Sequence, residues 1–228
     1  DLFFDSENWA VRYLVVAPHW LWNGRKALIS PIFLTKVDLT HKKIKVNLSK
    51  EEVQKGPQFE DYETVTRQHE AEMYDRFQVP YYWEGPQLWG IAAAPFELAL
   101  AATSEGNNWP REPLREENQT ESALWSLEEI QTYSIQSEEQ RFGAVEDLVV
   151  NVGNWKIQSI IANISHWPTS NRVMISAQWV KEMDWLAHTI QFALSREDLQ
   201  KSPHFDPKIP VNRGSRNADY DYRGRICY

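Results

Sequence analysis

The chain contains an internal repeat. When the sequence is shifted by 146 positions, residues 1–67 align with residues 147–213 without a gap, and 17 of the 67 aligned positions are identical. A gapless repeat keeps every turn and every strand alternation in phase, so we expect each copy to fold as one unit of the same design. The identical pairs include Asp1/Asp147, Asn8/Asn154, Ile29/Ile175, Asp38/Asp184 and Ile44/Ile190.

Two segments of each copy have the composition of β-strands. Residues 9–16 and 155–162 are rich in aromatic and β-branched side chains, which predicts strands buried largely on both faces. Residues 44–48 and 190–194 alternate between apolar and polar side chains, which predicts a strand with its apolar side chains turned inward. We therefore expect three matched pairs of core residues, which are Trp9 and Trp155, Val15 and Ile161, and Val46 and Phe192.

A short helix is predicted after these strands in both copies. Ser49 precedes Glu52 by three positions, and Ser195 precedes Asp198 by the same distance. A serine followed three residues later by an acidic residue forms a capping box, in which each side chain bonds the other residue's backbone N–H. Each copy is thus expected to contain several strands and then a helical turn.

Several stretches resemble the PRC-barrel family, named for the cytoplasmic domain of the photosynthetic reaction centre H subunit. They are residues 147–150 with 155–161, 25–31, 46–53, 57–60, and 124–130 leading to 142–147. The chain is most similar to the tandem, stand-alone bacterial members. The resemblance implies a small closed β-barrel that serves as an assembly or docking module, and it does not imply catalysis.

We therefore predict a mostly β protein with two small PRC-type β-barrels related by internal duplication. Each barrel is followed by a short helix, and a linker with helical segments joins them. Residues 1–83 are expected to form the first barrel together with a helix at 67–77, and residues 84–122 an acidic linker rich in proline and alanine. Residues 123–211 are expected to form the second barrel, and residues 212–228 a C-terminal tail.

The second copy has an opening segment that the first copy lacks. Residues 124–146 precede the repeat in the second copy, whereas the first copy begins at Asp1. The first barrel is therefore expected to lack its N-terminal hairpin here. Either residues upstream of Asp1 are missing from the sequence, which we favour, or the first copy is an incomplete barrel. A first barrel that naturally lacked this hairpin would expose a strand edge, and an exposed edge favours aggregation.

Composition narrows the class of protein. The net charge of −8 argues against general nucleic-acid binding, because phosphate attraction requires clustered lysine and arginine. Cys227 is the only cysteine, which excludes an internal disulfide and favours the cytoplasm. The longest weakly polar stretch, residues 88–102, is shorter than the roughly 20 residues of a membrane-spanning helix, so no membrane span is predicted.

We find no pattern typical of catalysis or metal binding. The six histidines do not occur at metal-ligand spacing, and no phosphate-binding loop or nucleophile motif is present, so we expect no catalytic residue, metal or cofactor. Trp20, Trp22 and Trp167 fall at a predicted hairpin tip. There they either pack against the sister domain or contact a partner.

The sequence thus favours a non-enzymatic adaptor or scaffold that binds a protein partner of unknown identity. Two domains on one chain would present paired surfaces to such a partner. Formation of a homodimer is a further alternative. The alternative function is binding of a small molecule or cofactor in a cleft between the two barrels, since domain junctions often hold pockets.

Overall fold

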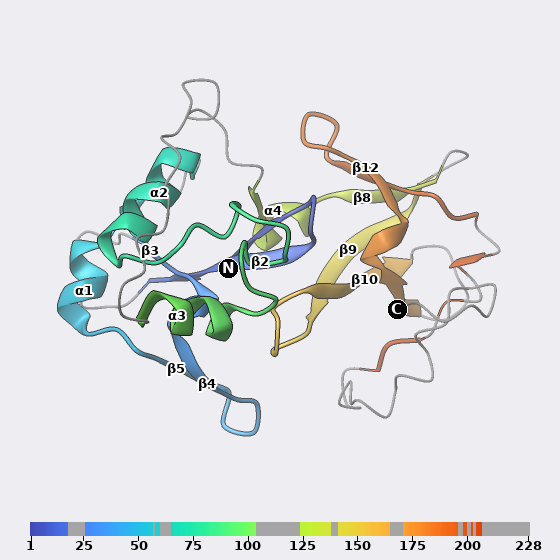
Figure 1. The fold of residues 1–228 in the computed structure, drawn as a ribbon. Coiled ribbons are helices and arrows are strands. Elements are labelled where there is room, and N and C mark those ends of the chain that lie inside the picture. The colour runs from blue at the N-terminus through green and yellow to red at the C-terminus, as the bar shows by residue number, and fades with distance from the viewer. Residues whose placement is uncertain are drawn as a thin grey trace. The chain divides into compact units, whose positions relative to one another are not determined.

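The computed structural model describes residues 1–17, 26–56, 58–59, 65–103, 124–137, 141–164, 171–195, 198–199, 202 and 204–206. The chain divides into two compact units (Figure 1). Unit 1 comprises Asp1–Ser126 and Asn151–Lys156, and unit 2 comprises Leu127–Val150 and Ile157–Tyr228.

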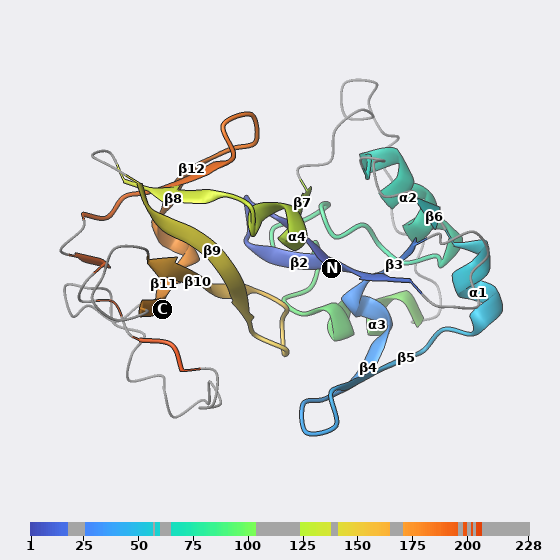
Figure 2. The same ribbon diagram turned by 180° about the vertical axis from the view of Figure 1, so that it is seen from behind.

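Unit 1 is built mainly from strands. They are β1 (Leu2–Asp5), β2 (Ala10–Val16), β3 (Lys26–Ile29), β4 (Leu34–Asp38), β5 (Lys43–Val46), β6 (Gln58–Phe59) and β7 (Leu124–Ser126). Five of them form an antiparallel sheet with the order β6-β3-β2-β1-β7. The other two, β4 and β5, pair with each other in a ribbon that extends away from this sheet (Figures 1 and 2).

Unit 1 also contains the 3₁₀ helix η2 (Pro31–Phe33) and the helices α1 (Lys50–Lys55), α2 (Arg67–Arg76) and α3 (Pro95–Thr103). The capping box predicted at the start of α1 is present, because the Glu52 backbone N–H donates to Ser49 Oγ and the Ser49 N–H donates to Glu52 Oε2. Helix α2 lies against the sheet with Tyr74 fully buried. Within the described part of the chain, no helix is long and apolar enough to cross a membrane.

Unit 2 forms one six-stranded sheet. Its elements are α4 (Leu127–Ile130), β8 (Ser134–Gln136), β9 (Arg141–Val150), β10 (Ile157–Ile164), β11 (Asn171–Ser176), η4 (Ala177–Trp179), β12 (Val180–Asp184) and β13 (Thr189–Phe192). The strand order is β11-β10-β9-β8-β13-β12. All neighbours are antiparallel except β8 and β13, which run parallel.

The prediction of two closed barrels is wrong, because the described residues form three open sheets. In unit 2, closure would require hydrogen bonds between the edge strands β11 and β12. These strands are instead joined end to end through η4. In unit 1, the β4–β5 ribbon is separate from the main sheet, since no described strand pairs with β5 in the way that β8 pairs with β13. The protein is mostly β, but the sheets formed by its described residues are open.

The strand pairing in unit 2 repeats that in unit 1 with 146 added to each residue number. Matched pairs are Leu2–Leu14 and Leu148–Ile160, Val15–Leu28 and Ile161–Met174, and Val37–Ile44 and Met183–Ile190. The pairing skips Arg12 at a register shift between β1 and β2, and it skips Gln158 at the matching shift between β9 and β10. Trp9 and Trp155 both have a left-handed backbone, with φ of 53° and 61°. Sheet register and irregularities are therefore shared by the two copies.

Candidate functional site

The tryptophans predicted to meet a partner or the sister domain, Trp20, Trp22 and Trp167, lie outside the described residues. Their role stays a prediction. Two other features of the described residues are candidates for a functional site. One is the exposed tip of each matched ribbon, and the other is a buried group of charged and aromatic side chains in unit 1.

The six predicted core residues differ in burial between the two copies. Trp155, Ile161 and Phe192 are buried, whereas Trp9 and Val15 are half-buried. Val46 is 41% exposed and is therefore a surface residue. The reason is the missing neighbour, because β13 is covered by pairing with both β12 and β8, whereas β5 pairs with β4 alone among the described strands.

The β4–β5 and β12–β13 ribbons end in the same turn. Asp38 Oδ1 accepts a hydrogen bond from the His41 backbone N–H at 3.0 Å, and Asp184 Oδ1 accepts one from the Ala187 N–H at 2.9 Å. An aspartate that bonds the backbone ahead of it fixes a tight turn. The bonds from the His41 backbone and ring lower the pKa of Asp38, which favours the charged form that accepts both.

Each turn also ends in a left-handed residue and presents a large apolar side chain. The backbone φ is 51° at Lys42 and 50° at His188, so both chains reverse direction in the same way. At the tips, Leu39 is 74% exposed, Trp185 is 63% exposed and Leu186 is 75% exposed. Leu39 and Trp185 occupy matched positions of the repeat. We call these three residues the hairpin tips.

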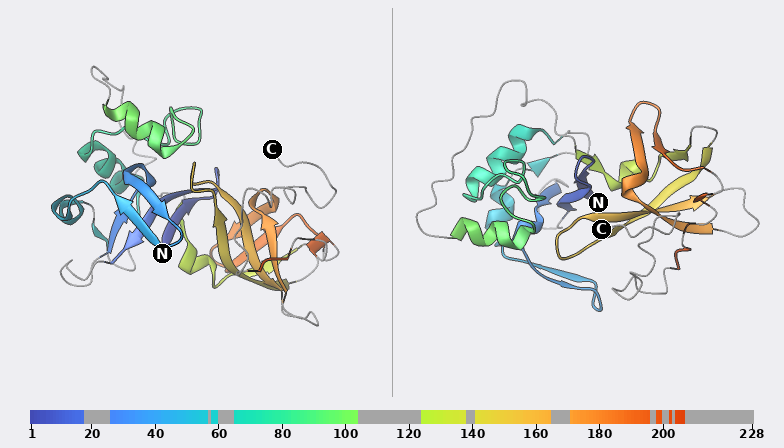
Figure 3. Two further views of the ribbon diagram at one scale, coloured as in Figure 1. Left: turned by 90° about the horizontal axis from the view of Figure 1, so that it is seen from below. Right: turned by 45° about the vertical axis from the view of Figure 1, so that its right-hand side comes forward.

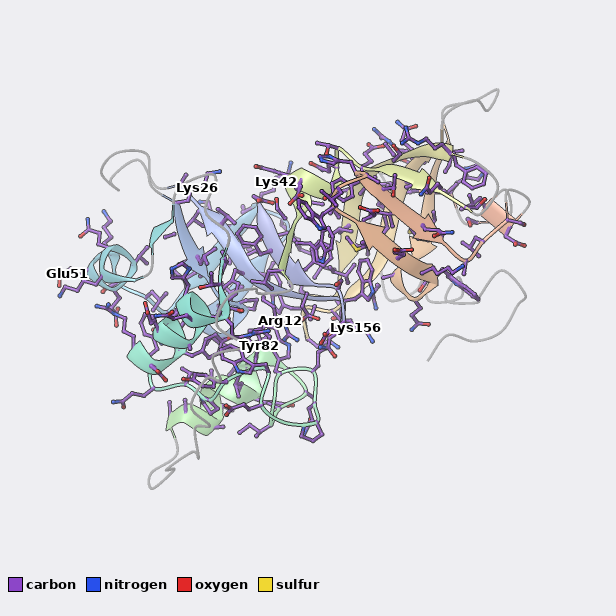
Figure 4. All side chains as sticks on the ribbon, turned by 90° about the horizontal axis from the view of Figure 1, so that it is seen from above. Arg12, Lys26, Lys42, Glu51, Tyr82 and Lys156 are labelled. Carbon is purple, nitrogen blue, oxygen red and sulfur yellow. The ribbon has the colours of Figure 1, made fainter. Side chains whose placement is uncertain are left out.

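A buried ion pair in unit 1 joins Arg12 of β2 to Asp5 of β1. The register shift between β1 and β2 leaves Arg12 without a strand partner, and a bulge of this kind can redirect a side chain. Arg12 Nε donates to Asp5 Oδ2 at 2.6 Å, and Nη1 donates to the Leu88 carbonyl at 2.8 Å. The guanidinium carbon lies 4.0 Å from the centre of the Tyr82 ring and 4.7 Å from that of Trp89. Figure 4 shows Arg12 and Tyr82 side by side.

A buried carboxylate extends this group. Glu70 of α2 accepts hydrogen bonds from the hydroxyls of Tyr13 at 2.8 Å and Tyr82 at 2.7 Å, and from Arg67 Nη1 at 2.9 Å. Burial raises the pKa of Glu70, while the Arg67 charge and the two hydroxyl donors oppose the rise. Burial and the neighbouring Glu70 charge raise the pKa of Tyr13 well above its ordinary value.

These side chains form the buried polar cluster, defined as Asp5, Arg12, Tyr13, Arg67, Glu70 and Tyr82. Its two arginines match its two carboxylates in charge, and the polar atoms bond one another. Such a satisfied network specifies packing, here of α2 and the segment around Tyr82 on the sheet. The matched positions of Asp5 and Arg12 in the second copy are Asn151 and Gln158, so both charges are absent there together. We therefore assign the cluster a structural role.

Metal binding was the next kind of site considered among the described residues. No group of three or more histidine, cysteine, aspartate or glutamate side chains that could hold a metal ion occurs in the part of the chain that the structure describes. In comparisons with known proteins, no family model and no curated protein matches the chain. The hairpin tips are therefore the strongest candidate for a functional surface.

Neither the hairpin tips nor the buried polar cluster was predicted from the sequence. For the tips a signal was present, because Asp38 and Asp184 are identical and each is followed directly by a large apolar residue. For the cluster the signal was weaker. Arg12 interrupts an apolar strand, but two of its contacts, Leu88 and Tyr82, are far away in the sequence.

Proposed function

We propose that the chain is a non-enzymatic adaptor that docks a protein partner through its two hairpin tips. The observation that carries this proposal is the matched exposure of Leu39 and Trp185 on identically built turns. A single exposed apolar residue is ordinary on a protein surface. Two at the same position of a repeat, each held by an aspartate and a left-handed residue, are better explained by contact.

The turn geometry suits this role. A side chain on a fixed turn loses little conformational freedom when it enters a pocket, and large apolar or aromatic residues supply much of the energy of interfaces. Two tips on one chain would also raise the effective concentration of the second contact once the first has formed. Binding to a bivalent partner should thus be much tighter than binding through either tip.

Chemical crosslinking in cell lysate followed by mass spectrometry tests the proposal. The full chain is compared with the tip variant Leu39→Ser/Trp185→Ser/Leu186→Ser. The control is Phe96→Ser, which alters an equally exposed apolar residue on α3. We expect the natural chain and the control to recover one stoichiometric protein partner, and the tip variant to lose it. Recovery of the free chain alone, or equal recovery by the tip variant, would contradict the proposal.

We also propose that the two units arose by duplication, supported by the 17 identities and by the shared register of their strands. Kinship with the PRC-barrel family is supported by the sequence stretches alone. A cytoplasmic location is supported by the single cysteine, since proteins of oxidising compartments commonly carry disulfides. The net charge of −8 supports a protein partner over a nucleic acid.

A further inference from the structure

The two hairpin tips are built on the same turn but carry different side chains. We call Leu39 the first tip and the pair of Trp185 and Leu186 the second tip. Figure 3 (right) shows each turn as a loop at the end of its ribbon, blue for residues 38–42 and orange for residues 184–188. Because the two backbones are alike, any difference in what the tips bind must come from their side chains.

The exposure of the first tip does not depend on a strand beside β5. In unit 2, β8 pairs with β13, yet residues 185–188 of the turn and Glu182 of β12 are all exposed. Their counterparts in unit 1, residues 39–42 and Lys36, are exposed in the same way. Both tips are therefore surface groups whether or not the edge of the ribbon is covered.

Basic side chains surround the first tip. Lys36 and Lys42 are exposed, and over residues 35–42 they outnumber Asp38, which gives a formal charge of +1 with His41 neutral. The Asp38 carboxylate is engaged by the backbone N–H and the ring of His41, both at 3.0 Å. The lysines are thus the charged groups that a docked surface would meet, and carboxylates on that surface would attract them.

The second tip is larger and lies among acidic groups. Over residues 181–188, Glu182 and Asp184 outnumber Lys181, which gives a formal charge of −1. The indole of Trp185 is mostly exposed, and its N–H requires a hydrogen-bond acceptor once a pocket buries it. A pocket that fits this tip is therefore large enough for an indole, contains an acceptor and has basic groups at its rim.

We propose that the two tips recognise two unlike pockets of one partner protein. The first tip enters a leucine-sized apolar pocket with carboxylates at its rim, and the second enters the indole-sized pocket with basic groups at its rim. Each set of charges attracts its own pocket and repels the other, which determines which tip enters which pocket. This inference rests on the proposed docking function. It excludes a symmetric partner that offers the same pocket twice.

Charged residues around an exposed apolar side chain have another use, which is to keep the surface soluble. The two roles predict different results. If the charges serve only solubility, reversing one of them leaves docking unchanged. If they guide docking, reversal weakens it, and a substitution that keeps the charge does not.

Zero-length crosslinking of the full chain in cell lysate tests the polarity of the contacts. A carbodiimide joins an amine only to a carboxylate that it already touches. We expect Lys36 or Lys42 to be joined to a carboxylate of the partner protein, and Glu182 to a lysine of the same protein. The two links should lie in different segments of that partner. The support comes from the polarity and position of the links, since capture of a protein alone would not distinguish the pockets.

Two conversion variants test whether the pockets differ. Each replaces three exposed residues at one tip by their counterparts at the other. They are Lys36→Glu/Leu39→Trp/Thr40→Leu, which has two second tips, and Glu182→Lys/Trp185→Leu/Leu186→Thr, which has two first tips. We expect each to recover about tenfold less partner than the natural chain, because only one tip still matches its pocket.

Single charge variants separate guidance from solubility. Lys36→Glu should weaken recovery of the partner, and Lys36→Arg should retain it. The control is Lys55→Glu, which makes the same charge change at an exposed position of α1 and should have no effect. Added salt should reduce the difference between Lys36→Glu and the natural chain, because salt screens exposed charges.

Several outcomes would overturn the inference. They are links from both tips to one segment of the partner, the absence of carbodiimide links while a longer crosslinker still recovers the partner, and full recovery by either conversion variant. Links to a second copy of this chain would identify a homodimer instead. If the serine variant of the tips loses the partner while both conversion variants keep it, this inference fails and the docking function stands. If the serine variant keeps the partner, the docking function itself fails.

Discussion

Ile44 and Ile190 occupy the same register position in two matched ribbons, yet Ile44 is 45% exposed and Ile190 is 0% exposed. The residue type, the turn beside it and the antiparallel neighbour strand are alike. What differs is the parallel strand β8, which covers β13 and has no described counterpart at β5. The burial of an apolar residue here depends on a strand from outside the ribbon.

This difference predicts unequal effects of one substitution. Ile190→Ala should lower the free energy of unfolding by about 2–5 kcal/mol, because it leaves a cavity in a packed core. Ile44→Ala should lower it by less than about 0.5 kcal/mol, since the side chain is partly in water already. Urea unfolding of the two variants, followed by tryptophan fluorescence, measures both values. Equal losses would mean that the two ribbons are equally packed.

Breaking the ion pair between Arg12 and Asp5 should strongly lower the free energy of unfolding of unit 1. Arg12→Gln leaves the Asp5 carboxylate buried without its partner, which should lower the free energy of unfolding by about 3–5 kcal/mol. The control is Arg172→Gln, which breaks the more exposed pair with Glu146 and should cost about 1 kcal/mol or less. Denaturant titration gives both numbers.

The second copy suggests a rescue of this variant. It carries Asn151 and Gln158 at the positions of Asp5 and Arg12. The double variant Asp5→Asn/Arg12→Gln should therefore be more stable than Arg12→Gln alone, because no buried charge remains unpaired. A double variant less stable than the single one would show that the carboxylate does not depend on Arg12.

Features of the fold that depend on neighbouring residues in the sequence could be predicted, whereas features that depend on distant strands could not. The strands at 43–46 and 189–192 and the capping box at Ser49 follow from local patterns, and all were within reach of the sequence. The exposure of Val46 could not be predicted, because the same alternation of apolar and polar residues occurs in a covered strand and in an uncovered one. The prediction of closed barrels was wrong for a similar reason. Whether β11 and β12 pair is decided by the path of the chain through η4, which periodicity does not report.

The pKa of Glu70 predicts a pH dependence of stability. Burial raises this pKa, so between the ordinary carboxyl value of about 4.3 and the raised value the folded chain keeps a proton that the unfolded chain has released. The stability contributed by protonation is fully present below that ordinary value and is lost as the pH rises through the raised one. Glu70→Gln does not titrate. The unfolding free energy of the natural chain minus that of Glu70→Gln should therefore fall as the pH rises above that ordinary value.

Chemical denaturation at several pH values measures this difference. The same variant removes one ionic partner of Arg67, so its absolute stability is less informative than the slope with pH. A difference that rises with pH would mean that the donors from Arg67, Tyr13 and Tyr82 outweigh burial and lower the pKa of Glu70.

Position 143 in unit 2 should not tolerate a residue larger than glycine. It lies in β9 opposite Ile164 of β10, and a Cβ atom there would lie 1.9 Å from the backbone oxygen of Asn163. The obstacle is backbone, so the strands would have to separate, and Gly143→Ala should lower the free energy of unfolding by about 3 kcal/mol or more. Gly153→Ala is the control, because a Cβ there meets the Asn151 side chain at 3.2 Å, and that side chain can move. Thermal unfolding of both variants checks this, and similar midpoints would show that β9 and β10 are not packed this closely.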